Sequence, residues 1–291
     1  MRRARLVSAL TALLVTSGCL VVGAVSAWAK NEPACLPNCQ GANLAGANMR
    51  GADLSGATFD GADLTGAILS LTTLTGTVFT NATLTNADLN GANLAQRDLT
   101  GAVLVGTNLK SANLSGAVLD NVNLSGANLS YATFTAASMT GARLVGTRLY
   151  KAEGAGAQLT AANLTRANML GADLSRAELT EATLTRTKAY RTVFTRAVLV
   201  RATIKNANLQ YANLTGADLT RANMAGTRLW GANLNNATAV RTRMSNTNIM
   251  RATFNRADLT RATLKGAYGS ATFRKTTFFR CILIGTCLRS A

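Results

Sequence analysis

Large apolar residues recur at every fifth position over most of this chain. From Leu44 to Leu264, each position whose number ends in 4 or 9 holds Leu, Phe, Met or Ile, except Gly154, Ala189 and Ala239. The position two residues earlier is almost always Ala or Thr, and the other three are mostly polar or Gly. A period of five fits neither an amphipathic helix nor a flat, half-buried strand. Such fixed self-similarity predicts a stacked repeat architecture.

Each five-residue unit supplies one large and one very small apolar residue. A chain that turns a corner once per unit would direct these two residues inward and the polar ones outward. No single unit can bury its large residue alone, so successive turns must stack to form a continuous core. The small position is explained by crowding inside a narrow coil.

The units at 126–130 (Gly-Ala-Asn-Leu-Ser) and 61–65 (Gly-Ala-Asp-Leu-Thr) resemble the pentapeptide-repeat family, whose consensus is A-[DN]-L-x-x. The resemblance covers residues 41–268. It implies an all-β fold, a right-handed quadrilateral β-helix (a β-solenoid) with four units per coil. About 11–12 such coils, at an interstrand spacing of about 4.8 Å, would form a rod roughly 50–55 Å long.

Residues 1–29 have the layout of a secretory signal peptide. Three arginines lie within the first five residues, and an uncharged, mostly apolar run follows and ends in Ala-Trp-Ala. This layout predicts cleavage before Lys30 and an exported protein, periplasmic or extracellular. Three alternatives stay open: the run is long enough to serve as an uncleaved membrane anchor, Cys19 resembles a lipoprotein site, and Arg2-Arg3 resembles part of a twin-arginine export signal. Only an uncleaved segment would give an integral membrane span.

Two short non-repetitive segments flank the repeats and each carries a cysteine pair. Residues 30–40 hold Cys35 and Cys39 and are expected to form an N-terminal cap. Residues 269–291 hold Cys281 and Cys287 and form a C-terminal coil and cap. In this segment the register slips by one residue, and the large apolar positions become Phe273, Phe278, Leu283 and Leu288.

The length of the rod restricts the disulfides that can form. Its ends are roughly 50 Å apart, whereas a disulfide requires Cα atoms within about 7 Å. Within one monomer, only Cys35–Cys39 and Cys281–Cys287 can therefore pair, and export favours disulfides. Free thiols in the two caps are the alternative.

Charge is distributed unevenly along the chain. The formal net charge is +17. Residues 41–140 hold three cations and six acids, whereas residues 141–291 hold 23 cations and six acids. The basic excess is thus confined to one half of the rod, which makes that half the place to look for an anionic partner.

Arginines recur every 20 residues in the basic half. With four units per coil, Arg201, Arg221, Arg241 and Arg261 would stack on one edge, about 4.8 Å apart. Like charges so close repel unless an anion or splayed side chains relieve them, and guanidinium groups suit phosphate, sulfate and carboxylate. The candidate anion-binding set also includes the neighbouring arginines Arg196, Arg251 and Arg256. The alternative interpretation is that these arginines form a solubilising face.

Aromatic residues follow the same 20-residue arithmetic. Tyr150, Tyr190 and Trp230 share one outward edge with Leu170 and Met250, half a coil from the arginines. An aligned aromatic series can form a protein or glycan contact. It can equally pack over the adjacent coils. The candidate interaction stripe consists of these three aromatics together with Tyr131 and Tyr211, which lie one position along.

Some departures from the repeat carry structural expectations. Gly154 lacks a core side chain, and Phe134 one coil earlier is expected to fill the gap. Phe59 and Phe79 are expected to stack. Arg97 occupies an inward small position, where an unpaired charge would be costly. We expect a local bulge that turns its side chain outward.

Catalysis has little support in the sequence. There is no His, which removes the commonest acid–base group and metal ligand. The acids are scattered at consensus Asp positions that normally stabilise turns. We therefore expect no enzyme activity, no cofactor and no metal.

Three functions remain. The first is a non-catalytic exported scaffold or interaction protein with an unknown partner, with end-to-end self-association as one option. The second is a polyanion-binding module for nucleic acid, acidic glycan or lipid headgroups. The third is implied by the resemblance, since some family members mimic DNA and protect type II topoisomerases. The basic half and the export signal argue against DNA mimicry.

Overall fold

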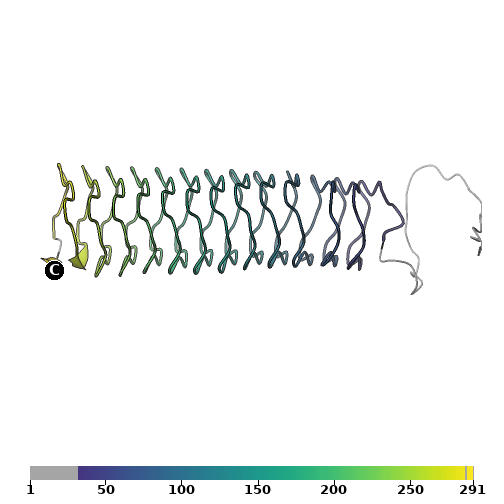
Figure 1. The fold of residues 1–291 in the computed structure, drawn as a ribbon, viewed down its shortest axis with the longest axis horizontal. Coiled ribbons are helices and arrows are strands. Elements are labelled where there is room, and N and C mark those ends of the chain that lie inside the picture. The colour runs from purple at the N-terminus through teal and green to yellow at the C-terminus, as the bar shows by residue number, and fades with distance from the viewer. Residues whose placement is uncertain (1–31, 286, 291) are drawn as a thin grey trace, which may run out of the picture.

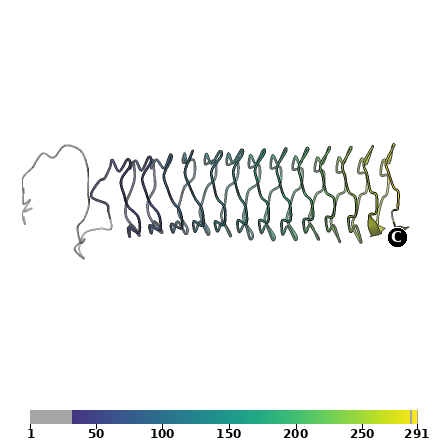
Figure 2. The same ribbon diagram turned by 180° about the vertical axis from the view of Figure 1, so that it is seen from behind.

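The computed structural model describes residues 32–285 and the backbone of 287–290, so the predicted signal at 1–29 lies outside the described residues. Figures 1 and 2 show one rod of stacked coils along which the chain advances steadily from the N-terminal to the C-terminal end. Parallel bridges join residues 20 apart, from Asn38–Thr58 to Asn248–Tyr268. Each coil therefore contains four five-residue units, as predicted.

One unit illustrates how the sequence forms a side of the coil. Leu54 is fully buried, and its amide donates to the carbonyl of Thr73 in the next coil at 2.9 Å. The chain then turns, and the amide of Ala57 donates to the carbonyl of Leu54 at 3.0 Å. Gly56 stands in the turn with φ +70°, a conformation that glycine adopts without steric cost. The Asp53 carboxylate accepts the amide of Ser55 at 3.1 Å, so the acidic residue stabilises the turn.

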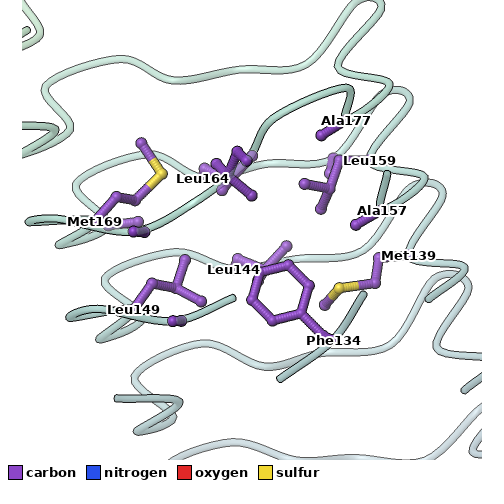
Figure 3. Packing of buried hydrophobic residues seen from close by; sticks show 14 of the residues in the cluster. Phe134, Met139, Leu144, Leu149, Ala157, Leu159, Leu164, Met169 and Ala177 are labelled. Carbon is purple, nitrogen blue, oxygen red and sulfur yellow. The ribbon is translucent and has the colours of Figure 1, made fainter. Parts of the chain in front are cut away.

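The apolar residues form one core along the rod axis. Phe59 and Phe79 stack with ring centroids 5.5 Å apart and an interplanar angle of 11°, as expected. Phe134 points into the interior (Figure 3), and a Cβ atom built at Gly154 would lie only 2.0 Å from a carbon of its ring. The expected filling of this gap by Phe134 is confirmed. Thr77 is tolerated in a small inward position because its hydroxyl donates to the carbonyl of Leu54 at 3.0 Å.

The C-terminal register slip is also confirmed. From Thr253–Thr272 onward, bridged residues are 19 apart instead of 20. The two strands longer than a single bridge among the described residues lie in this region. Strand β1 (Tyr268–Ala271) pairs in parallel with β2 (Cys287–Ser290), with Tyr268 opposite Cys287. One residue is therefore missing from this coil, and every later outward position moves back by one.

The local bulge expected at Arg97 is absent. No extra residue is inserted, because Asp98 still bridges to Val118 twenty residues later. Instead, the backbone ladder opens between residues 71–79 and 90–98, where the amides of Leu74 and Phe79 do not donate to the next coil. Arg97 is partly exposed, and its Nε donates to the carbonyl of Ala95 at 3.1 Å. The side chain lines a cavity of about 210 Å³ between the separated coils.

Candidate anion-binding edge and aromatic stripe

Turn residues form four edges along the rod, and bridging residues form the four faces between them. The four predicted arginines lie on one edge, as expected. The amide of Arg221 donates at 2.8 Å to the carbonyl of Val240, the residue immediately before Arg241, and the same bond recurs from Arg201 to Thr220 at 2.9 Å. All four side chains are exposed. Their stacking thus follows directly from the backbone ladder.

A fifth arginine extends this edge. The amide of Arg261 donates to the carbonyl of Phe279 at 2.8 Å, which places Arg280 above Arg261. The guanidinium of Arg280 lies over the Phe279 ring, 5.3 Å from its centroid. Arithmetic in steps of 20 missed this residue, although the register slip in the sequence contained the signal. The arginine ladder consists of Arg201, Arg221, Arg241, Arg261 and Arg280.

The first rung is neutralised. An Arg201 nitrogen lies 3.0 Å from a carboxylate oxygen of Glu181, and both side chains are about half exposed. Over the described part of the chain, Arg221, Arg241 and Arg261 have no such acidic partner within ion-pair distance. The accessible positive charge therefore begins at Arg221.

The ladder borders a shallow hollow. This hollow has a volume of about 480 Å³, and its apolar lining includes Val200, Val240 and Phe279. Cations at a partly apolar surface are less well hydrated than cations in open water, so they interact more strongly with an anion. The arrangement suits an elongated anionic group that spans several coils.

The ladder arginines occupy an unfavourable backbone conformation. Their φ angles lie between +52° and +61°, in the left-handed region, which costs about 1–2 kcal/mol for a residue with a Cβ atom. In the first coils the same edge carries glycine at 41, 61 and 101, where this cost is absent. The basic half thus places arginine where the repeat favours glycine.

The other predicted cations do not join the ladder. Arg196 and Arg256 lie on the adjacent edge, and the face between the two edges carries Asp218 and Asp258. Arg251 lies elsewhere, with its guanidinium 5.7 Å from the centroid of the Trp230 ring. The seven predicted arginines are therefore divided over three edges.

The predicted aromatic stripe lies on one edge as a chain of ring contacts. Tyr211 contacts Tyr190 and Trp230 edge to face, with ring centroids 5.5 and 4.8 Å apart. Tyr131 and Tyr150 form a second edge-to-face pair at 5.2 Å. The rings pack on adjacent coils, as the second alternative predicts, and they also remain partly exposed; their role as an interaction stripe stays a prediction.

Cations cover some of these rings. The guanidinium of Arg191 lies 5.3 Å from the centroid of Tyr190 and 5.9 Å from that of Tyr211. The ammonium of Lys151 lies 5.5 Å from the centroid of Tyr150. Cation–π attraction fixes the cations beside the rings, so aromatic and positive groups alternate along this edge.

The two ends of the rod differ in their cysteines. Cys35 and Cys39 form the predicted disulfide, with Cα atoms 5.0 Å apart, and Cys39 belongs to the core. At the other end Cys281 is a free thiol, at odds with the predicted Cys281–Cys287 bridge, and the side chain of Cys287 lies outside the described residues. Burial raises the pKa of the Cys281 thiol, which lowers its reactivity.

The two acidic residues with lowered pKa values accept hydrogen bonds that stabilise the turns and the stacking of coils. Hydrogen bonds, first from Thr80 and next from Asn81, hold the pKa of Asp60 below its usual value. The Thr65 hydroxyl and amide do the same for the pKa of Asp63. Within residues 32–285, no three potential metal-ligating side chains gather, and no helix has the length and apolarity needed to cross a membrane.

Comparison with known proteins agrees with the repeat. The profile of the family described as Pentapeptide repeats matches in eight copies, with segments running from 38–76 to 228–266. HetL of the cyanobacterium Nostoc, involved in heterocyst differentiation regulation, is 33% identical over 78% of this chain and 91% of its own, with a TM-score of 0.30.

Two further solved structures are similar. A pentapeptide repeat protein of the Arabidopsis thaliana thylakoid lumen is 35% identical over 34% of this chain and 66% of its own, with a TM-score of 0.26. QnrB1, a plasmid-mediated fluoroquinolone resistance protein, is 14% identical over 76% of this chain and 90% of its own, with a TM-score of 0.31. No curated protein sequence matches.

Proposed function

The chain belongs to the pentapeptide-repeat family, and on that premise we propose that it is a non-catalytic interaction rod whose arginine ladder binds an anionic polymer. Proteins of this family are right-handed quadrilateral β-helices that generally act as non-enzymatic scaffolds. The ladder is the part of this rod that gives the general role a chemistry.

One observation carries the proposal: Arg221, Arg241 and Arg261 stack on one edge without acidic partners among the described residues. Stacked like charges repel one another. A bound polyanion would offset the repulsion. Guanidinium groups recognise phosphate, sulfate and carboxylate through paired N–H donors.

The test is retention on immobilised heparin over a salt gradient. Replacing Arg221→Gln together with Arg241→Gln should move elution to clearly lower salt, because contacts between cations and a polyanion weaken steeply as salt rises. The matched control is Arg176→Gln with Arg196→Gln, which removes the same charge from the adjacent edge. That control should elute close to the unchanged protein.

Circular dichroism of each variant verifies that the β-helix is intact. Equal elution of the ladder variant and the unchanged protein would contradict the proposal. Equal loss in both variants would also contradict it, because the binding would then follow net charge and not the ladder.

We also propose that the protein is exported, on the basis of the signal-like layout of residues 1–29. The measurement is the intact mass of the protein recovered from the exported fraction. A mass equal to that of a chain beginning at Lys30 would support a cleaved signal. A full-length product held in the membrane fraction would favour an uncleaved anchor.

DNA mimicry is not proposed. A mimic of DNA must present negative charge along its surface, whereas residues 141–291 carry 23 cations against six acids. A basic rod would instead compete with other cations for the anionic polymer.

A further inference from the structure

A second set of cations lies on a face that is separate from the ladder. Parallel bridges connect Arg148, Asn168, Lys188, Asn208 and Arg228 in this order, one residue from each successive coil. The three cations are exposed and the two asparagines are partly buried. Charge therefore recurs at every second coil, about 9.6 Å apart at an interstrand spacing of about 4.8 Å. The cationic row consists of Arg148, Lys188 and Arg228.

Each cation of the row is followed two positions later by an aromatic residue of the stripe. The pairs are Arg148 with Tyr150, Lys188 with Tyr190, and Arg228 with Trp230. Because each aromatic residue stands at the edge that borders the face of the row, cation and ring lie side by side on the same coil. The rod thus repeats one unit of cation plus ring every 40 residues.

The rings of this repeat are held in place by their neighbours. Tyr211, from the intervening coil, contacts both Tyr190 and Trp230 edge to face. A Cβ atom added at Gly231 would approach the Tyr211 ring to 2.8 Å, so glycine at this position leaves room for the ring. Pre-positioned rings lose little conformational entropy when a ligand binds.

Acidic side chains are absent from the face of the row over residues 141–285. Glu153 and Asp173 bridge to each other on the face beyond the aromatic edge, beside the first unit of the repeat. The later units, around Lys188 and Arg228, have Val193 and Asn233 in the corresponding places. An anion should therefore bind most tightly at these later units, because no acidic side chain lies beside them.

We propose that this surface, the aromatic–cation track, binds a linear β-linked polysaccharide that carries one carboxylate in each disaccharide. In such a chain alternate sugars turn the same side toward a flat surface, so its acidic groups recur with a period like that of the track. The carboxylates pair with the row, the sugar rings cover Tyr190 and Trp230, and Asn168 and Asn208 bond hydroxyl groups.

Nucleic acid fits this track less well. Phosphates in a DNA strand follow one another about every 3.4 Å along the axis, far closer than the cations of the row. Single-stranded nucleic acid also needs open ring faces on which successive bases stack. Here neighbouring rings are at 69–76° to each other, so they do not offer a series of parallel faces to successive bases.

The test uses the full-length chain with Trp28→Phe, which leaves Trp230 as its single tryptophan. Hyaluronan oligosaccharides of even length are titrated while tryptophan emission is recorded. We expect a saturable change in Trp230 emission, weaker for neutral chitin oligosaccharides of equal length. Adding Lys188→Gln and Arg228→Gln should weaken the hyaluronan affinity about tenfold or more, as expected for two charge-assisted hydrogen bonds.

The matched control carries the ladder substitutions Arg221→Gln and Arg241→Gln, which remove the same charge from the diagonally opposite edge. Its hyaluronan affinity read from Trp230 emission, which reports binding at the track, should change less than about twofold, although its heparin retention falls. No change in Trp230 emission, equal weakening by both charge pairs, or tighter binding of single-stranded DNA than of hyaluronan would overturn the proposal. Because each readout compares the ladder pair with the track pair, and the two pairs lie on different parts of the rod, the track and the ladder can fail independently.

Discussion

The ring of Phe134 occupies the space that a side chain at Gly154 would need, one coil further along the rod. The two positions would each hold a large residue in the regular repeat, and here they share one volume. Figure 3 shows this ring beside Met139 and Leu144 in the core. The irregular sequence at 154 is thus compensated within the fold.

This sharing predicts strong coupling between the two positions. Gly154→Leu should destabilise the protein by about 1–3 kcal/mol, because overpacking forces neighbouring side chains off their rotamers. Combining it with Phe134→Leu should recover most of that loss. Urea denaturation of the single and double variants measures the coupling energy. Additive effects of the two changes would show that they do not share the space.

The opened ladder at Arg97 predicts that a smaller residue stabilises the rod. Arg97→Ala should let residues 90–98 close onto 71–79 and restore backbone hydrogen bonds, each of which contributes about 0.5–1.5 kcal/mol. The amides of Leu74 and Phe79 should then exchange with solvent more slowly, and the melting temperature should rise. Arg97→Lys is the control, since it retains a long cation. Unchanged exchange at both amides would contradict this account of the gap.

Asp60 joins three successive coils, which predicts loss of stability in acid. Its carboxylate accepts hydrogen bonds from Gln40 at 3.0 Å, Thr80 at 2.5 Å and Asn81 at 3.2 Å. The pKa of Asp60 is lower in the folded than in the unfolded chain. Its stabilising contribution is therefore complete above the unfolded pKa, and it is lost as pH falls through the lower folded pKa.

The measurement is the melting temperature against pH for the unchanged protein and for Asp60→Asn, which cannot ionise. The difference between the two should be constant near neutral pH and should shrink below about pH 4. A difference that stays constant into the acid range would show that the charge of Asp60 does not stabilise the coils.

The ion pair between Glu181 and Arg201 predicts a simple gain of function. Glu181→Gln should free the first rung of the arginine ladder, and heparin elution should then move to higher salt. Stability should change by less than about 1 kcal/mol, because exposed ion pairs contribute little. Glu178→Gln, on the neighbouring face, removes an equal charge and serves as the control. An equal shift in both variants would attribute the gain to net charge.

Much of the fold could be predicted from the sequence because burial in this architecture is local. Every unit must direct its large apolar residue (for example Leu54) and its small residue (for example Ala52) inward, so a period of five already identifies the residues of the core. The Phe59–Phe79 stack and the filling of Gly154 by Phe134 follow once the family resemblance supplies four units per coil, and the Cys35–Cys39 disulfide follows from the length of the resulting rod. The number of units per coil came from the family resemblance.

The details of the candidate site depended on three-dimensional structure. Steps of 20 residues aligned Arg201 through Arg261, but the lost residue near Tyr268 shifted Arg280 onto the same edge. Whether Glu181 reaches Arg201 depends on side-chain torsions that no spacing specifies. The bridges also showed that Arg148, Lys188 and Arg228 share a face beside the aromatic stripe.

The repeat, the inward residues and the basic half can all be predicted from the sequence, because each unit is short and buries the same two positions. The three-dimensional structure was needed to find which charges are paired, where the backbone ladder opens at Arg97, and which cations lie beside which rings. These outcomes depend on the orientation of exposed side chains and on contacts between coils. A period in sequence fixes neither, because exposed side chains are not constrained by packing in the core.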